Sequence, residues 1–582
     1  MTRKHIQLND AYKQFSADQD KLLSPDKTVR RVKEKFKTLD IDILSETARI
    51  DNGRLDIPVF FSVCGKDAAR LTGTSKQMGK GATPAQAEAS AIMELVERFS
   101  VYSFAKNPDN FIVDTYTNVA EKALPFDWIA RSVHDPHAAS GADSNAAREI
   151  FADLPLKWTW AQDLTHDRPL LVPFDWFFAI NAFNGTSAGN APEEAICQGI
   201  CEIVERHVSA LACREKTPVP AIDPASVADP VALEMLNKFR NNGISLYLSD
   251  FTRDMGIPTV GVLARDPATH PQKSEIVWTA GTTPNPEKAL SRALSETAQL
   301  GGDFNTGSNY EASGLPKPAA LEEARFITHP GSRVPISALP DISHTNIKTE
   351  IENCVAALSK RDMPVLGIST RHEKLDIPAY YCLIPGAHFR ERAAATSVAM
   401  FCGKLITEKY PAQTAIERLS TIEQKLPGRY YIQFYLGCAH LEANEPTAAL
   451  ARFEKALDSG PEPQDVPSIY AYMGICLKEL AYYEKALAVL HEGLDWDAER
   501  TDIHNLMGFC YFKLGEHKKA IRSFEQVLRF NPGSAIDYAN IATNYRELGD
   551  RENAVAYYRL ALELDPDIGF ARENLEKLLG QA

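Results

Sequence analysis

The sequence predicts two domains, an α+β domain followed by an all-α repeat domain. Over residues 21–408, strand-like runs such as "IPVFFSV", "TVGVLAR" and "AYYCLIPG" alternate with helical runs, which is typical of helices packed on sheets. From about residue 430 onward, the strand-like runs give way to helices that repeat at a fixed period. The 582 residues are 44% hydrophobic and 24% charged, which is ordinary for a globular chain of more than one domain.

The C-terminal repeat has a period of 34 residues, which is visible in Gly474, Gly508 and Ala542. Its clearest unit is "NLMGFCYFKLGEHKKAIRSFEQVLRFNP", with small residues where two helices would approach and aromatic residues where a gap would be filled. This is the tetratricopeptide pattern of two packed helices per unit. We expect about four such units and a C-terminal capping helix, because the fixed period disfavours a generic helical bundle.

Two segments outside these patterns are expected to lack regular structure. Residues 1–20 contain few apolar anchors, so we expect a partly disordered N-terminal tail. Residues 130–149, "ARSVHDPHAASGADSNAARE", are rich in turn-forming residues and are expected to form a surface loop. The predicted organisation is therefore a tail (1–20), an α+β domain (21–408) and a repeat domain (409–582).

Composition excludes several classes of partner. The formal net charge of −14 disfavours direct binding to the phosphate backbone of nucleic acids. The first residues, "MTRKHIQLNDAYKQF", contain no apolar stretch of the secretory type, and no window is apolar over the length that crosses a bilayer. The ten cysteines are scattered without C-x-x-C or zinc-type spacing, which is typical of thiols that stay reduced. We therefore expect a cytoplasmic protein without membrane or nucleic-acid partners.

One pattern occurs three times in the predicted α+β domain, in residues 78–100, 186–208 and 283–302. Each copy has the form P-x-x-A, followed by polar residues at i, i+4 and i+7. Proline favours the first helical turn, and residues at these spacings share one face of a helix. The remaining positions are mostly apolar, so each copy predicts a buried helix with one narrow polar stripe. The three stripes are Ser90, Glu94 and Glu97; Gln198, Glu202 and Glu205; and Arg292, Glu296 and Gln299.

These stripes point to a site, because carboxylates brought this close cannot all stay ionised without cations. A solvated face is disfavoured, since it would spread polar residues over half of each helix. A buried ion-pair network between the helices remains an alternative. A Mg²⁺ and nucleoside triphosphate site explains more, because Mg²⁺ prefers carboxylate oxygens and arginines bind phosphates. The chain lacks the P-loop motif, and its candidates are the carboxylates Glu94, Glu97, Glu202, Glu205 and Glu296 with Arg98, Arg206 and Arg292.

The same residues resemble the signature of the YcaO family of ATP-utilising proteins. S-x-x-x-E-x-x-E-R occupies residues 90–98, N-x-x-x-E-x-x-x-Q-x-x-x-E-x-x-E-R residues 190–206, and R-x-x-x-E residues 292–296. In "DKLLSPDKT", a lysine and a hydroxyl residue match the family's N-terminal positions. The resemblance covers residues 20–408 and implies an ATP site with more than one Mg²⁺. It implies nucleotide contacts from Lys21, Thr28, Ser90, Arg98, Asn190, Gln198, Arg206 and Arg292, and Mg²⁺ ligands among Glu94, Glu97, Glu194, Glu202, Glu205 and Glu296, while the catalytic residue stays unassigned.

The resemblance also implies a function, for which three alternatives stay open. The first is an accessory factor for β-methylthiolation of a small-subunit ribosomal protein, with the repeats binding a protein partner. The second is an enzyme that phosphorylates backbone amide oxygens of a peptide or protein and forms thioamides or azolines. The ending "LEKLLGQA" lacks the proline-rich tail of azoline-forming members and favours thioamides within this alternative. The third is a repeat-based interaction module with a structural ATP site; a homodimer is an open expectation in each case.

Overall fold

The computed structural model describes residues 6–51, 53–134, 141–270, 274–301, 318, 320–389, 396–531 and 533–580. The chain divides into two compact units: unit 1 comprises Met1–Pro136 and Ala152–Thr396, and unit 2 comprises His137–Phe151 and Ser397–Ala582. Unit 1 combines helices with sheets and unit 2 is helical, so the predicted fold class is confirmed. The division falls before α13 (Val398–Lys409), whereas the sequence-based boundary lies after residue 408.

The described strands of unit 1 form three sheets, with orders β1-β2-β3, β11-β10-β9-β8-β12 and β4-β5-β13-β14-β7, and β6 pairs with β5. The paired strands run antiparallel, except for the parallel pair β8 and β12. The strands are β1 (Leu44–Arg49), β2 (Val59–Cys64), β3 (Lys76–Lys80), β4 (Ile112–Asp114), β5 (Leu156–Asp163), β6 (Arg168–Pro173), β7 (Thr186–Ala188), β8 (Ala221–Ile222), β9 (Ser245–Asp250), β10 (Thr259–Arg265), β11 (Val277–Thr282), β12 (Arg333–Val334), β13 (Leu366–Ser369) and β14 (Ala379–Leu383).

The three helices predicted from the repeated pattern are α3 (Pro84–Lys106), α8 (Pro192–Glu215) and α10 (Pro286–Gly301), and each begins at its proline. Each packs mainly on a different sheet: α3 on β2 and β3, α8 on β7 and β14, and α10 on β10 and β11. The three sheets therefore position three similar helices. The other α-helices of unit 1 are α1 (Pro25–Lys37), α2 (Lys66–Thr72), α4 (Tyr116–Val119), α5 (Phe126–Ala130), α7 (Phe174–Asn181), α9 (Pro230–Asn241), α11 (Arg325–Thr328) and α12 (Ile347–Ser359).

Glycines allow two of these helices to lie very close to their strands. Gly79 of β3 faces α3, and a Cβ atom there would collide with the backbone of Ala91. Gly281 of β11 faces α10, and its Cβ would collide with the carbonyl of Ala289. Around these contacts, apolar residues such as Ile92 of α3 and Leu290 of α10 are fully buried. The positions of α3 and α10 are thus set by backbone contact as well as by apolar burial.

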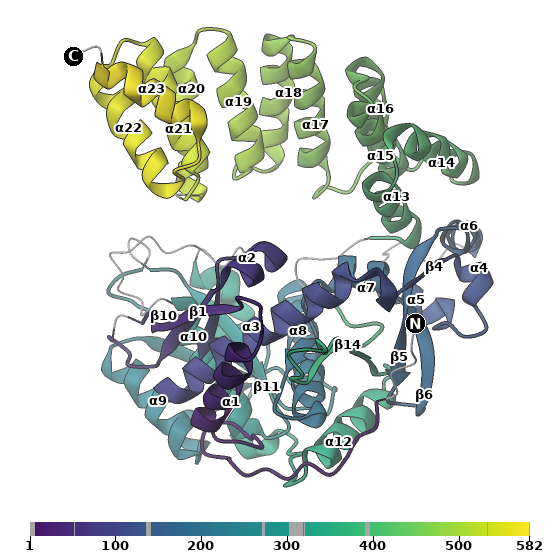
Figure 1. The fold of residues 1–582 in the computed structure, drawn as a ribbon, viewed down its shortest axis with the longest axis vertical. Coiled ribbons are helices and arrows are strands. Elements are labelled where there is room, and N and C mark those ends of the chain that lie inside the picture. The colour runs from purple at the N-terminus through teal and green to yellow at the C-terminus, as the bar shows by residue number, and fades with distance from the viewer. Residues whose placement is uncertain are drawn as a thin grey trace. The chain divides into compact units, whose positions relative to one another are not determined.

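Unit 2 consists of consecutive paired helices, as the tetratricopeptide period predicts (Figure 1). Small residues sit at the pair contacts: an added Cβ would lie 2.6 Å from the Phe524 ring at Gly508 and 2.5 Å from Leu490 at Gly474. Its helices are α6 (Gly141–Ala152), α13, α14 (Ala412–Lys425), α15 (Tyr430–Glu442), α16 (Pro446–Asp458), α17 (Val466–Glu479), α18 (Tyr483–Trp496), α19 (Thr501–Lys513), α20 (His517–Phe530), α21 (Ala535–Glu547), α22 (Arg551–Leu564) and α23 (Gly569–Gly580).

Two expectations for irregular segments differ from the structure. The turn-rich residues 130–149 contain the start of α6, and residues 135–140 lie outside the described part of the chain. Within the predicted tail, residues 6–20 are anchored, because Ile6 and Ala11 are buried and Lys13 pairs with Glu350 at 2.6 Å. As far as the described residues go, no helix has the length and apolar character needed to cross a membrane.

Candidate functional site

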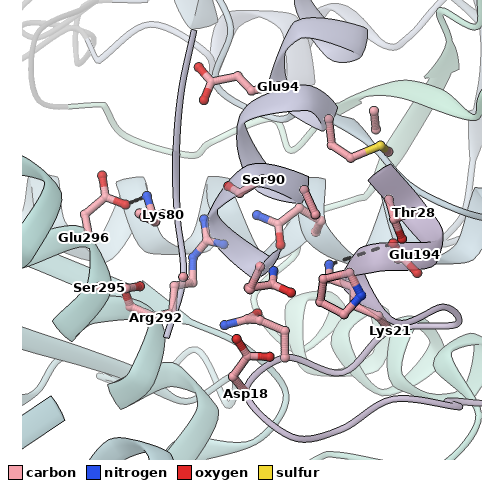
Figure 2. Close-up of a pocket in the computed structure, with 18 of the residues that line it drawn as sticks. Asp18, Lys21, Thr28, Lys80, Ser90, Glu94, Glu194, Arg292, Ser295 and Glu296 are labelled. Atoms are coloured by element: carbon pink, nitrogen blue, oxygen red, sulfur yellow. Dashed lines mark hydrogen bonds and ion pairs between the residues drawn. The ribbon is translucent and has the colours of Figure 1, made fainter. Parts of the chain in front are cut away.

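A cavity of about 280 Å³ lies in unit 1, lined by α1, α3, α8, α10 and the chain preceding α1. All the site residues predicted from the sequence line this cavity except Glu205. Figure 2 shows Ser90 and Glu94 projecting from α3, while Arg292, Ser295 and Glu296 come from α10. The three polar stripes therefore converge on one space, as the sequence pattern predicts.

On α3, Arg98 lies between two carboxylates of its own helix, 3.4 Å from Glu94 and 3.2 Å from Glu97. The Thr186 hydroxyl donates a hydrogen bond of 2.5 Å to the carboxylate of Glu97. Burial raises the pKa of Glu97 to about 8, and the neighbouring Glu202 and Glu94 carboxylates add to this shift against the opposing effect of Arg98. One arginine thus does not neutralise the carboxylates at this wall.

On α8, Glu202 lies 3.9 Å from Arg206 and accepts a weak backbone hydrogen bond of 3.4 Å from Gly185. Burial raises the pKa of Glu202 despite the nearby guanidinium groups of Arg206 and Arg98. The Nε of Arg206 is buried and has no hydrogen-bond partner among the described residues. An unpaired buried donor costs stability, so this atom fits an anionic ligand.

The first turn of α8 ties the chain before α1 to the cavity. The Asn190 amide donates to Glu194 at 3.0 Å and to the hydroxyl of Thr28 at 3.1 Å. The backbone N–H of Leu22 donates to the other oxygen of Glu194 at 3.1 Å, and the Lys21 ammonium lies 4.0 Å from the oxygen that accepts from Asn190. Both oxygens of Glu194 are therefore already used inside the protein.

Arg292 of α10 separates Glu205 of α8 from the other predicted ligands. The Nε of Arg292 donates to Glu205 at 3.0 Å, and the backbone N–H of Thr282 donates to the same oxygen at 3.1 Å. Gln198, with its amide oxygen turned toward Arg292, accepts two bonds of 2.8 and 3.0 Å. Glu205 does not line the cavity. It orients Arg292 instead of facing a ligand.

Two charged cavity residues were missed by sequence reasoning, Lys80 and Asp18. Lys80, the last residue of β3, forms an ion pair with Glu296 (Figure 2). Burial lowers the pKa of Lys80 to about 7, and the nearby Arg292 adds to this shift. The "GKG" sequence at residues 79–81 was the available signal, but alone it is weak evidence for phosphate binding. Nothing in the sequence around Asp18 distinguishes it from a surface aspartate.

The side chains of the cavity suit Mg²⁺ that binds together with a phosphate ligand better than a metal ion held by protein ligands alone. Within the described residues, no three histidine, cysteine, aspartate or glutamate side chains are placed to hold one metal ion. Mg²⁺ commonly takes one or two carboxylates and completes its shell with water and phosphate oxygens. The raised pKa values of Glu97 and Glu202 show that added positive charge would stabilise their ionised forms.

The fold and cavity define a class: an α+β protein with an arginine- and carboxylate-lined anion site, without a P-loop, joined to helical repeats. Residues 78–388, over half of the chain, match the family model described as YcaO cyclodehydratase, ATP- and Mg²⁺-binding. The chain belongs to the YcaO family, and ATP and Mg²⁺ are its cofactors. Residues 499–567 match a tetratricopeptide repeat model.

Individual relatives agree with this assignment. An uncharacterized protein of Methanothermobacter thermautotrophicus is 26% identical over 386 residues, covering 62% of this chain and 93% of the relative. The ribosomal protein S12 methylthiotransferase accessory factor YcaO of Escherichia coli is 28% identical over 245 residues, 38% of this chain and 40% of that protein. A heterocyclase solved with its substrate and cofactor has a TM-score of 0.54 at 21% identity, covering 66% of this chain and 55% of the heterocyclase, which shows a shared fold.

Proposed function

We propose that this protein binds Mg·ATP in the cavity of unit 1 and uses it to activate an amide oxygen of a protein or peptide substrate. The charge arrangement carries this proposal. Carboxylates with raised pKa values, Glu97 and Glu202, lie in one cavity with Arg206, whose Nε lacks a partner in the described structure. A ligand that brings both cations and anionic oxygens satisfies both groups at once.

Each wall has a distinct role in this proposal. Arg98, Arg206 and Arg292 hold phosphate oxygens, and Glu205 orients Arg292 through the 3.0 Å bond. Bound Mg²⁺ supplies neutralisation of the phosphate charge. The carboxylates that would hold it are Glu94, Glu97, Glu202 and Glu296, with Glu194 beside them, and the remaining nucleotide contacts would come from Lys21, Thr28, Ser90, Asn190 and Gln198.

Two finer reactions are candidates. Thioamide or azoline formation through amide-oxygen phosphorylation is supported by the family description, which is that of a cyclodehydratase. A role as accessory factor in ribosomal protein methylthiolation is supported by the similarity to the Escherichia coli factor, of which the chain spans 40%. In both cases we propose that unit 2 binds a protein partner, as its repeat pattern favours. A purely structural ATP site is disfavoured, because buried carboxylates with raised pKa values cost stability without a function.

Calorimetric titration of the full chain with Mg·ATP tests the site. Arg206→Ala is expected to abolish measurable binding while the thermal unfolding midpoint changes little. Arg240→Ala, which removes an arginine of α9 outside the cavity, is the matched control and should bind as the unmodified chain does. Equal affinity in the Arg206 and Arg240 variants would refute the site.

Mass spectrometry of the proteome with and without the gene separates the two finer reactions. A methylthio group lost from a ribosomal protein supports the accessory role. Loss of an oxygen-to-sulfur exchange or of an azoline in a peptide backbone supports amide activation. We also propose a cytoplasmic location, which the ten free cysteine thiols favour.

A further inference from the structure

The chain before α1, residues 6–23, contributes Asp18, Gln19, Lys21 and Leu23 to one wall of the nucleotide cavity, and hydrogen bonds and ion pairs attach it to the rest of unit 1. The backbone N–H of Asn9 donates to Glu193 at 2.6 Å, and that of Ala11 donates to the side chain of Asn346 at 2.9 Å. Lys13 lies 2.8 Å from Asp20 and 2.6 Å from Glu350. These bonds fix the position of the residues between Lys13 and Lys21 relative to α8 and α12.

Asp18 lies in this wall, and its carboxylate is unusual. The residue is 3% exposed and lines the cavity, yet neither carboxylate oxygen has a hydrogen-bond partner in the described parts of the chain. Burial raises the pKa of Asp18, and the nearby backbone amides and the Lys288 and Lys21 ammonium groups offset only part of that shift. A buried carboxylate without partners is costly, so a ligand with donor groups is expected to complete it.

The position of Asp18 separates it from the carboxylates proposed to hold Mg²⁺. Figure 2 shows Asp18 on the same side of the cavity as Lys21, with Glu94 on the opposite side. Glu94 and Glu296 have Arg98 and Lys80 as ion-pair partners, whereas Asp18 has no ion pair among the described residues. Asp18 is therefore placed to contact a part of the nucleotide other than the phosphates that carry the metal.

The chemistry of ATP narrows the choice of the group that Asp18 could contact. The triphosphate is anionic and would be repelled by the Asp18 carboxylate. The adenine edge places a ring-nitrogen acceptor beside its one amino group, so a second carboxylate oxygen would face a lone pair. The ribose offers two adjacent hydroxyl donors, which match the two unpartnered oxygens. An aspartate or glutamate hydrogen-bonded to a ribose hydroxyl is an established solution in other nucleotide-binding folds.

We propose that Asp18 accepts hydrogen bonds from the 2′- and 3′-hydroxyl groups of the nucleotide ribose and so selects ribonucleotides over deoxyribonucleotides. The proposal rests on the proposed binding of Mg·ATP in this cavity. It makes residues 6–23 part of the specificity apparatus rather than a tail. Lys21, three residues further along, lines the same cavity and carries the segment toward α1.

The test is calorimetric titration of the full chain with ATP, 2′-deoxy-ATP and 3′-deoxy-ATP in the presence of Mg²⁺. The unmodified chain is expected to bind each deoxy analogue roughly 10- to 100-fold more weakly than ATP, the effect of one hydrogen bond to a charged group. Asp18→Asn is expected to bring the three affinities within about threefold of each other, because a neutral amide oxygen accepts a weaker bond. Asp26→Asn is the matched control, since Asp26 is an exposed carboxylate in the first turn of α1 and does not line this cavity.

The outcomes distinguish the proposal from its premise. Equal affinity of the unmodified chain for ATP and both deoxy analogues would overturn the role of Asp18 while leaving ATP binding in place, and this measurement needs no variant. If Asp18→Asn weakened the binding of all three nucleotides equally, so that the ratios of their affinities stayed the same, the role of Asp18 would also be overturned. That result would mean that the substitution only loosens the segment before α1. Loss of the preference in Asp26→Asn would count against it in the same way. No binding of any nucleotide by the unmodified chain would remove the proposed function and this proposal together.

Discussion

Glu97 in unit 1 and Glu423 in unit 2 have pKa values that move in opposite directions. Burial and neighbouring carboxylates raise the pKa of Glu97 to about 8. Burial also opposes ionisation of Glu423, but Lys455 at 2.7 Å, Gln433 at 2.7 Å and Arg452 at 3.0 Å lower its pKa to about 2. The glutamate of unit 2 has all its partners within the protein, while the carboxylates of unit 1 have a deficit of cations that a ligand must supply.

The same contrast holds for packing. In unit 2, helix pairs meet through small residues against rings, as Gly508 does against Phe524. In unit 1, α3 and α8 carry Glu97 and Glu202, carboxylates whose pKa values burial raises. Burial of unpaired charge lowers stability, whereas small-residue packing increases it. The difference indicates that unit 1 gives up stability for its site and that unit 2 is built as a scaffold.

The largest expected effect comes from exchanging glutamate for glutamine in each unit. Glu202→Gln is expected to weaken Mg·ATP binding by about 100-fold or more, the size of losing a charged interaction of about 3 kcal/mol. Its free energy of unfolding without ligand should stay equal or rise, because a carboxylate with a raised pKa is removed. Glu423→Gln should do the reverse, with unchanged affinity and lower stability. Calorimetry measures the Mg·ATP affinity of both variants, and chemical denaturation measures their free energy of unfolding. A Glu202 variant that loses stability but keeps its affinity would contradict the contrast between the two units.

An intermediate effect is expected from the helix contact of unit 2. Gly508→Ala places a Cβ 2.6 Å from the buried Phe524 ring and should lower the free energy of unfolding of unit 2 by about 1–3 kcal/mol. Gly569→Ala is the control, because a Cβ there has no atom within 4 Å. Mg·ATP affinity should not change in either variant. Denaturant titration followed by circular dichroism measures the loss, and equal stability of the two variants would contradict the packing account.

The smallest effect concerns pH. The pKa of Glu423 is lowered in the folded state, so its contribution to stability is present above its ordinary value of 4.5 and is lost as pH falls toward 2. Because the side chain keeps some solvent contact, we expect about 1–2 kcal/mol over this window. Unfolding curves of the unmodified chain and Glu423→Gln, measured between these pH values, should converge at the acid end. A constant gap between the curves would exclude the ion pairs as the cause.

Much of this architecture is readable from the sequence where a pattern repeats. The 34-residue period predicts the helix pairs of unit 2, and the threefold P-x-x-A pattern predicts α3, α8 and α10 with their converging stripes. A repeated pattern allows this prediction because each copy supports the same interpretation of the others. A single charged residue on one helix gives no such support.

The missed features depend on tertiary contacts rather than on pattern. Glu205 has the spacing of a cavity residue, yet Arg292 and Thr282 hold it behind the wall. Asp18 becomes a cavity residue only because distant partners, among them Asn346 and Glu193, anchor the chain around it. The start of α6 falls in a segment rich in turn formers, where local preference is a weak guide, and this helix belongs to unit 2 although the chain on either side of it belongs to unit 1.

The glycine contacts of Gly79 and Gly281 have a mechanical consequence. Backbone pressed directly on backbone leaves no side chain that could change rotamer, so α3 and α10 cannot shift relative to their strands without breaking sheet hydrogen bonds. We expect the wall formed by the chain before α1 to yield first, because individual hydrogen bonds and ion pairs attach it. Amide hydrogens of α3 should consequently exchange with solvent at the rate of global unfolding, and those of residues 6–23 through smaller openings that bound nucleotide suppresses.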